Sequence, residues 1–192
     1  MESAFLKCGA IGLALALSAC ATGGGGNAST AGGMDVARFH LGEQTIARSQ
    51  IAIEAFDRAD ANLPEFRVYA AAVARELSRL GWTVVPAATR TEQVALIDVS
   101  QGSRREIAAR TAARVGRSVA AAAAADAPNV TATLLEVGIR RRSDATVFWE
   151  GRAVGEARTG SAEAASTAAV ERLATALFRD FPGESGRTIR VR

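Results

Sequence analysis

The sequence has 192 residues, a formal net charge of +3 and 22% charged residues. This length suits one domain behind a short N-terminal segment. The small positive charge is carried mainly by scattered arginines, whereas binding of nucleic-acid phosphates needs clustered Lys and Arg, so we expect no nucleic-acid partner.

The two cysteines belong to the N-terminal segment. Cys8 opens an apolar run that ends at Leu17, and Cys20 follows three residues later. The run is too short to cross a bilayer, which needs ~20 apolar residues, but it matches the apolar region of a secretory signal peptide. Lys7 precedes the run, although Glu2 offsets its charge. The pattern predicts a signal peptide over residues 1–19, and a Cys8–Cys20 disulfide is the alternative use of the cysteines.

The end of this leader carries a more specific pattern. Leu17-Ser18-Ala19-Cys20 resembles the lipobox of bacterial lipoproteins. The resemblance implies cleavage between Ala19 and Cys20, a lipid thioether on Cys20 and a fatty acyl group such as palmitate on the new amine. Ala21 in place of Asp implies, by resemblance to enterobacterial sorting, an outer-membrane anchor. An ordinary signal peptide cut near Ala19 or Ala21, which would release a periplasmic protein, is the alternative.

A linker follows the lipid-bearing cysteine. Residues 21–33 contain Gly, Ala, Ser, Thr and Asn and no large apolar side chain, so burial cannot offset the entropy of ordering them. We therefore divide the chain into a signal peptide at 1–19, the lipidated Cys20 with a flexible linker at 20–34, and a periplasmic domain at 35–192.

The first half of this domain alternates strand and helix patterns. Ala37, Phe39 and Leu41 alternate with Arg38 and His40, which predicts a strand whose first set is buried. A second strand is expected over 50–56, with Ile51, Ile53 and Ala55 on one face, and short strands over 82–85 and 93–101. Between them, one apolar stripe at helical spacing predicts a helix that ends before Gly81; its members are Phe66, Tyr69, Val73, Leu77 and Leu80.

The second half predicts a hairpin, a helix and a last strand. Residues 131–142 and 147–156 each alternate apolar and charged side chains around the polar turn 143–145, as in an antiparallel sheet with one wet face. A helix over 161–179 follows, and a strand over 188–191. The stripe of this helix comprises Ser166, Val170, Leu173, Leu177 and Phe181. We expect an α+β fold, with a mostly antiparallel sheet of six to seven strands and two amphipathic helices on one face.

Residues 102–128 are rich in Ala and Arg and allow two interpretations. A helix would place Glu106, Arg110, Arg114 and Arg117 on one face and Ala108, Ala112, Val115 and Val119 on the other. One interpretation is a basic helix that touches anionic lipid or a partner. The favoured one is an exposed insertion with a solvated arginine face, because alanines are too small for firm membrane insertion.

From Phe39 onward the chain resembles the bacterial envelope lipoproteins of the domain-of-unknown-function family 4136. The segments that carry the resemblance are 66–69, 73–77, 80–84, 95–99, 147–153 and 177–183, beginning with Phe66-Arg67-Val68-Tyr69 and ending with Leu177-Phe178-Arg179-Asp180-Phe181-Pro182-Gly183. The resemblance implies a lipid-anchored envelope protein and carries over no catalytic residue.

Few residues suggest chemistry. His40 is the one histidine, and we expect it as a solvated strand residue rather than a catalytic base. With no second histidine and no free thiol, we expect no metal and no other cofactor. Asp57 and Asp60 lack the spacing of a calcium loop and suit a solvated turn. Asp98 lies within an apolar strand and allows two interpretations. It could be an acid in a cleft, but the favoured interpretation is an ion pair with an arginine on the solvent-exposed face of the sheet. Phe148 is either an exposed binding contact or covered by residues 102–128.

These patterns favour a lipid-anchored envelope lipoprotein without catalytic residues, that is, not an enzyme. Its partners would be the membrane, through Cys20, and an unidentified envelope protein. An alternative is a periplasmic protein that binds a small molecule or lipid fragment in a pocket between sheet and helices. An envelope hydrolase is the least favoured hypothesis. A contiguous exposed apolar patch would favour the first, a closed apolar pocket the second, and clustered acids with raised pKa the third.

Overall fold

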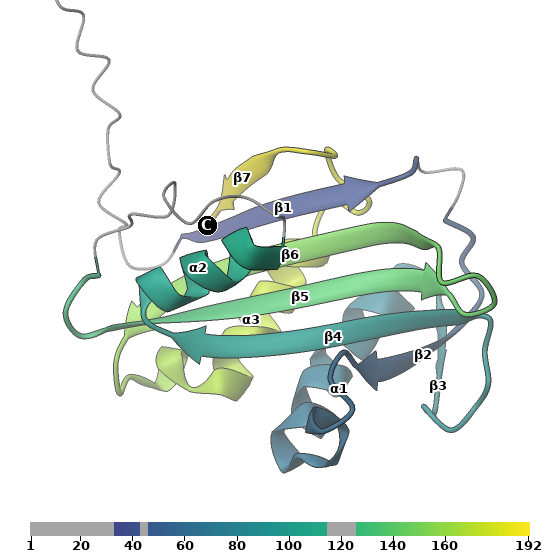
Figure 1. The fold of residues 1–192 in the computed structure, drawn as a ribbon, viewed down its shortest axis with the longest axis horizontal. Coiled ribbons are helices and arrows are strands. Elements are labelled where there is room, and N and C mark those ends of the chain that lie inside the picture. The colour runs from purple at the N-terminus through teal and green to yellow at the C-terminus, as the bar shows by residue number, and fades with distance from the viewer. Residues whose placement is uncertain (1–32, 43–45, 115–125) are drawn as a thin grey trace, which may run out of the picture.

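The computed structural model describes residues 33–42, 46–114 and 126–192 (Figure 1). The predicted strands and helices begin within three residues of their expected starts, except that the helix expected from residue 161 begins five residues later. The elements, in chain order, are β1 (Met34–His40), β2 (Gln50–Ala55), the 3-10 turn η2 (Asp60–Asn62), α1 (Pro64–Arg79), β3 (Thr83–Val85), β4 (Gln93–Gly102), α2 (Arg104–Arg114), β5 (Val130–Arg141), β6 (Val147–Arg158), the 3-10 turn η4 (Ala162–Ala164), α3 (Ser166–Phe178) and β7 (Thr188–Val191).

The described residues form an α+β fold around a seven-stranded sheet of order β3-β2-β4-β5-β6-β1-β7. The sheet is mixed, because β2 runs parallel to both β3 and β4. The expectation of a mostly antiparallel sheet was therefore wrong. Parallel neighbours need a long crossover, usually a helix, and α1 supplies it between β2 and β3. The sequence pattern shows each element but not which strands become partners.

Helices lie on both faces of the sheet, two on one face and one on the other. In Figure 1, α1 and α3 lie behind the sheet and α2 lies in front of it. The main core fills the space between the sheet and the pair α1 and α3, whereas Ile107 of α2 forms a separate small cluster with Ala132, Leu134 and Val154. The described chain thus holds three α-helices on two faces, not the expected two on one face. We call the α1/α3 side the covered face and the other side the open face.

The stripe predicted on the first helix is confirmed. α1 begins with Pro64, which has no N–H to leave unsatisfied, and buries Val73 and Leu77 completely. It ends where predicted, because Gly81 has a φ of +100°, which glycine adopts without steric cost. Trp82 then turns inward and its backbone N–H donates to the Leu77 carbonyl at 3.0 Å.

The orientation predicted for β1 was wrong. Val36 and Arg38 face the core with 0% and 2% exposure, while Phe39 and Leu41 are 41% and 65% exposed. The reason is that Arg38 binds the C-terminal end of α3, where carbonyl groups lack helical partners. Its Nε donates to the Leu177 carbonyl at 2.8 Å, and its Nη2 donates to the Ala176 carbonyl at 3.0 Å. An alternation of hydrophobicity cannot reveal a buried arginine that caps a helix.

Aromatic rings close the core beside this cap. Trp149 stacks on Phe178 with ring centroids 5.2 Å apart and contacts Phe181 at 5.1 Å, while Trp82 meets Phe181 edge-on. The indole Nε1 of Trp149 donates to the Pro182 carbonyl at 3.0 Å. The segment after α3 is thereby fastened to β6.

The hairpin of β5 and β6 confirms its predicted inner face, since Leu135, Val137 and Ile139 are fully buried. Its outer face is not uniformly wet, because α2 buries Leu134. Phe148 is 3% exposed and belongs to the main core, so both expectations for it were wrong. The register shifts beside Ile139, as in a β-bulge, and a bulge turns a side chain toward the other face.

The segment 102–128 is only partly described. Residues Arg104–Arg114 form α2, whose Ile107 is 3% exposed, so this part contributes to a core and is not an exposed insertion. Glu106 and Arg110 are exposed, as predicted for the charged face of this helix. The alanine run and the expected contacts of Val115, Arg117 and Val119 lie outside the described residues.

Candidate functional site

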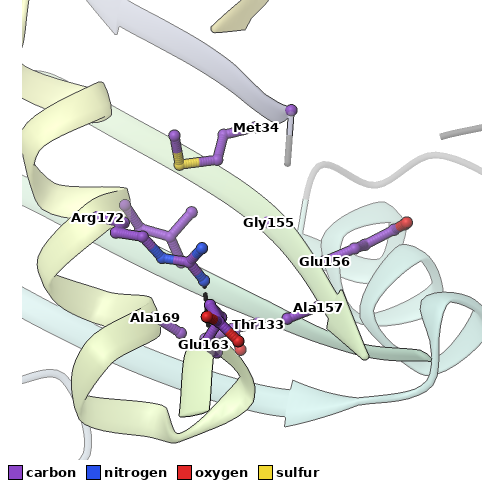
Figure 2. A pocket seen from close by; sticks show the side chains of 10 residues that line it. Met34, Thr133, Gly155, Glu156, Ala157, Glu163, Ala169 and Arg172 are labelled. Carbon is purple, nitrogen blue, oxygen red and sulfur yellow. Dashed lines mark hydrogen bonds between the residues drawn. The ribbon is translucent and has the colours of Figure 1, made fainter. Parts of the chain in front are cut away.

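The hollow at the start of β1 is too small for a ligand. It lies between the N-terminal part of α3 and the ends of β5 and β6 (Figure 2). Its volume of about 10 Å³ holds at most one water molecule. Arg172 spans it, donating from Nη2 to the Glu163 carbonyl at 2.7 Å. Hydrogen bonds from the Glu163 backbone N–H and from the Ser161 hydroxyl keep the pKa of the Glu163 carboxyl below its usual value.

Two larger hollows are open grooves with a mixed polar and apolar lining. One, of about 560 Å³, lies where α2 begins and β6 ends, and Arg104 forms an ion pair there with Glu156. Its hydrogen bond to this carboxylate raises the pKa of Arg104 further. The other, of about 440 Å³, lies beside α3 and contains Arg75, which is paired with Glu171 at 2.9 Å. Neither hollow is the closed apolar pocket that a small-molecule binder would offer.

A fourth hollow combines apolar and acidic side chains. It lies between the N-terminal part of α1 and strand β4 and has a volume of about 190 Å³. We call it the β4 cleft. The residues that line it come from η2, α1 and β4: Asp60, Leu63, Glu65, Phe66, Tyr69, Ile97, Asp98 and Val99. The charged members are all acidic, in a chain whose net charge is +3.

The chain forms the β4 cleft because β2 stops early. Its last residue is Ala55, after which the Phe56 N–H donates to the Ile97 carbonyl at 2.8 Å and the chain turns away into η2. This turn leaves Phe56 and Leu63 59% and 48% exposed. α1 then begins at Pro64, and Phe66 and Tyr69, three residues apart on one helix face, line the cleft.

The edge of β4 continues beyond this point. β4 extends through Gly102, whereas its pairing with β2 ends at Ile97, and Figure 1 shows β4 running well past β2. Backbone groups alternate sides along a strand, so Val99 and Gln101 direct their N–H and C=O groups to the same side as Ile97. In the part of the chain that the structure describes, no strand pairs with β4 on this side after Ile97. This is an open sheet edge beside the β4 cleft.

The open face also carries a buried charge network. Arg152 of β6 donates to Glu136 of β5 at 2.9 Å, and their side chains are 11% and 6% exposed. Arg152 also pairs with Glu150, and its guanidinium carbon lies 5.9 Å from the ring centre of Phe39. Asp98, predicted to pair with an arginine, stands opposite Glu136 in the register and lines the β4 cleft.

His40 was predicted on the wet face and lies on the covered side, in line with Val36 and Arg38. Its Nε2 is 3.0 Å from the Gly183 carbonyl, and its Nδ1 accepts the Gly42 N–H at 3.2 Å. An Nδ1 that accepts leaves Nε2 as the donor, so the ring has a structural role in holding the segment after α3.

The other residues and sites predicted from the sequence do not form a site among the described residues. Asp57 accepts the Ala59 N–H at 2.9 Å, as a turn residue does. Among the described residues, no three metal-binding side chains come together, and no helix is long and apolar enough to cross a membrane. The cleavage site at Ala19 and the lipid-bearing Cys20 lie outside the described residues. Phe56 and Leu63 were not predicted as exposed contacts, although each is a large apolar residue beside the turn between β2 and α1.

Comparisons with known proteins identify similar chains but no function. No family model matches the sequence. The chain is 26% identical to the uncharacterized protein ZMO1243 of Zymomonas mobilis, covering 83% of this chain and 80% of that one.

Solved structures resemble the fold distantly. One is a PDZ domain protein from Parabacteroides distasonis, with 11% sequence identity and a TM-score of 0.48. The match covers 82% of this chain and 38% of the PDZ domain protein. Another is the PelC dodecamer from Paraburkholderia phytofirmans, with 11% sequence identity and a TM-score of 0.40. The match covers 76% of this chain and 91% of the PelC chain.

Proposed function

We propose that this protein is a lipoprotein of the bacterial envelope, anchored in the outer membrane through Cys20, whose periplasmic domain is a non-catalytic interaction module. The resemblance to the domain-of-unknown-function family 4136 supports the same role. The observation that carries the anchor is Leu17-Ser18-Ala19-Cys20, placed at the end of an apolar leader.

The position of the first strand agrees with this proposal. β1 begins at Met34, so residues 21–33 separate the anchor from the sheet. Residues 21–32 lie outside the described residues; a flexible chain of this length, as the composition predicts, would have a root-mean-square reach of ~20 Å. The domain would therefore sample the space next to the membrane while the acyl chains, at ~0.8 kcal/mol per buried CH₂, prevent its release.

Exposed apolar groups favour an interaction module over a small-molecule binder. Three of the four hollows are water-sized or open, so they suit no enclosed ligand, and the fourth, the β4 cleft, has room for only one large side chain. By contrast, large apolar side chains are exposed at two places. Phe39, Leu41 and Val147 lie where β1 ends and β6 begins. Leu63 lines the β4 cleft, and Phe56 directly follows β2, before the turn that leads to the cleft. Exposed apolar groups that cluster in this way are typical of protein contact sites.

The anchor is tested by metabolic labelling with palmitate in cells that produce the full chain. Cys20→Ser should abolish the label on the protein, because the serine oxygen cannot form the thioether. The matched control is Cys8→Ser, in the same leader, which should keep the label. Equal labelling of the two variants, or none of the unaltered protein, would overturn the proposal.

A further inference from the structure

We propose that the β4 cleft binds an extended polypeptide segment of a partner protein, which adds to the open edge of β4 and presents apolar and basic side chains to the cleft. This inference deepens the proposed interaction role and rests on it. It does not depend on the lipid anchor.

The edge supplies the main-chain part of the interaction. Past Ile97, Val99 and Gln101 direct backbone donors and acceptors toward the side that β2 has left. An incoming strand there would continue the line of β2 and bond to the same groups. Natural sheets protect such edges with charges, proline or a covering segment, and residues 99–102 have neither a proline nor a charged side chain. The Gln101 side chain is engaged elsewhere, because its amide nitrogen donates to the Thr133 hydroxyl of β5 and to the Ala164 carbonyl of η4.

The β4 cleft supplies the apolar contacts of the proposed interaction. Its volume of about 190 Å³ exceeds the ~150 Å³ cavity that accepts benzene, so it has room for one large aliphatic or aromatic side chain. Phe66 and Tyr69 are partly buried within it, and Leu63 stands at its rim with 48% exposure. Alternate side chains of a bound strand point to one face, so every second residue of the segment would face this hollow.

Charge determines which segment fits. The charged residues that line the cleft are Asp60, Glu65 and Asp98. Lysine or arginine beside the apolar anchor would be attracted, and acidic residues would be repelled, which gives discrimination by charge. The partner segment is therefore extended, apolar at alternate positions and basic between or beside them.

The test uses a labelled peptide of this chemistry and the full lipidated protein in a neutral maltoside detergent. The probe is fluorescein-labelled Arg-Thr-Ile-Arg-Val-Arg, which copies residues 187–192 and already forms a strand in this fold. The comparison peptide is Glu-Thr-Ile-Glu-Val-Glu. Fluorescence polarisation should show saturable binding of the basic peptide and at least about tenfold weaker binding of the acidic one.

Variants and hydrogen exchange locate the site. Glu65→Lys should weaken binding of the basic peptide by about fivefold, whereas Glu171→Lys, an exposed acid on α3, should leave it within about twofold. The bound peptide should slow amide exchange in residues 97–102. Equal affinity for both peptides, no saturable binding, or equal effects of the two variants would overturn the inference.

Two further outcomes distinguish strand addition at the β4 edge from binding at another surface and from binding of a small cation. Protection that maps to another surface would overturn the strand site while leaving an interaction module. If N-acetylarginine amide displaces the probe as effectively as the unlabelled peptide does, the cleft binds a small cation and the strand site is wrong.

Discussion

The covered and open faces of the sheet are stabilised by different kinds of contact. Against α1 and α3, the sheet buries large apolar rings around Trp149, and the charged side chain of Arg38, buried among them, caps a helix. On the open face, the ion pair of Glu136 and Arg152 links β5 and β6, and Ile107 of α2 packs on a small apolar cluster from the same two strands. Among the described residues, the covered face therefore carries most of the apolar core, whereas α2 covers only part of the open face and the end of β4 has no strand partner on one side.

The largest expected effect tests this division directly. Trp149→Ala removes the ring that contacts Phe178 and Phe181, and should lower the free energy of unfolding by about 3–5 kcal/mol. Phe39→Ala, on the open face, should cost about 1 kcal/mol or less because its ring is 41% exposed. Urea unfolding followed by circular dichroism measures both. Similar losses of unfolding free energy in the two variants would contradict the claim that the covered face contributes more to stability than the open face.

The charge network offers the next test. Arg152→Met leaves the Glu136 carboxylate in a site where it is 6% exposed, and should cost about 3 kcal/mol in unfolding free energy. Replacing both, in Glu136→Leu/Arg152→Met, should recover most of that loss, because no unpaired charge stays buried. Thermal unfolding of the two variants gives the comparison. A double variant less stable than the single one would show that the pair itself stabilises the open face.

A smaller effect is expected at α2. Ile107→Ala should lower the free energy of unfolding by about 2 kcal/mol, the low end for such a change, because the cluster around it is small. Arg105→Ala on the same helix, where the side chain is 71% exposed, should change it by less than about 0.5 kcal/mol. Hydrogen exchange should rise in Arg104–Arg114 for the first variant only. Unchanged exchange would mean that Ile107 does not hold α2 on the sheet.

The smallest effect concerns the turn between β5 and β6. A hydrogen bond from the Thr146 backbone N–H, followed by one from Arg141, keeps the pKa of Asp144 below its usual value. A lowered folded-state pKa stabilises the protein above the unfolded-state pKa, and this is lost as pH falls through the folded-state value. Asp144→Ala should therefore lower Tm at pH 6, with a gap that shrinks below about pH 4. A constant gap down to pH 2 would contradict this assignment.

The sequence predicts the elements well because periodicity is local. The stripe through Val73 and Leu77 and the alternation around Leu135 each reflect a neighbourhood of a few residues, and both are confirmed. Strand pairing is not local, so the parallel placement of β2 beside β4 could not be deduced from either strand alone. A buried Arg38 and a bulge at Phe148 reverse the hydrophobic pattern for reasons that lie in distant elements.

The candidate site was harder to predict than the fold. Asp60 and Asp98 were each noted separately, but the β4 cleft exists because β2 is shorter than β4 and η2 turns Leu63 outward. Strand lengths relative to a partner are set by the assembled sheet. The anchor differs, since a signal peptide and lipobox are recognised as linear sequence and Cys20 is proposed from sequence alone.

The anchor is tested most directly by intact-mass and N-terminal peptide mass spectrometry of the protein purified from its own membranes. The account predicts that the chain begins at Cys20, with residues 1–19 absent and a diacylglyceryl thioether and an N-linked acyl group on that residue. A bare thiol at Cys20, or a chain that still carries its leader, would contradict it.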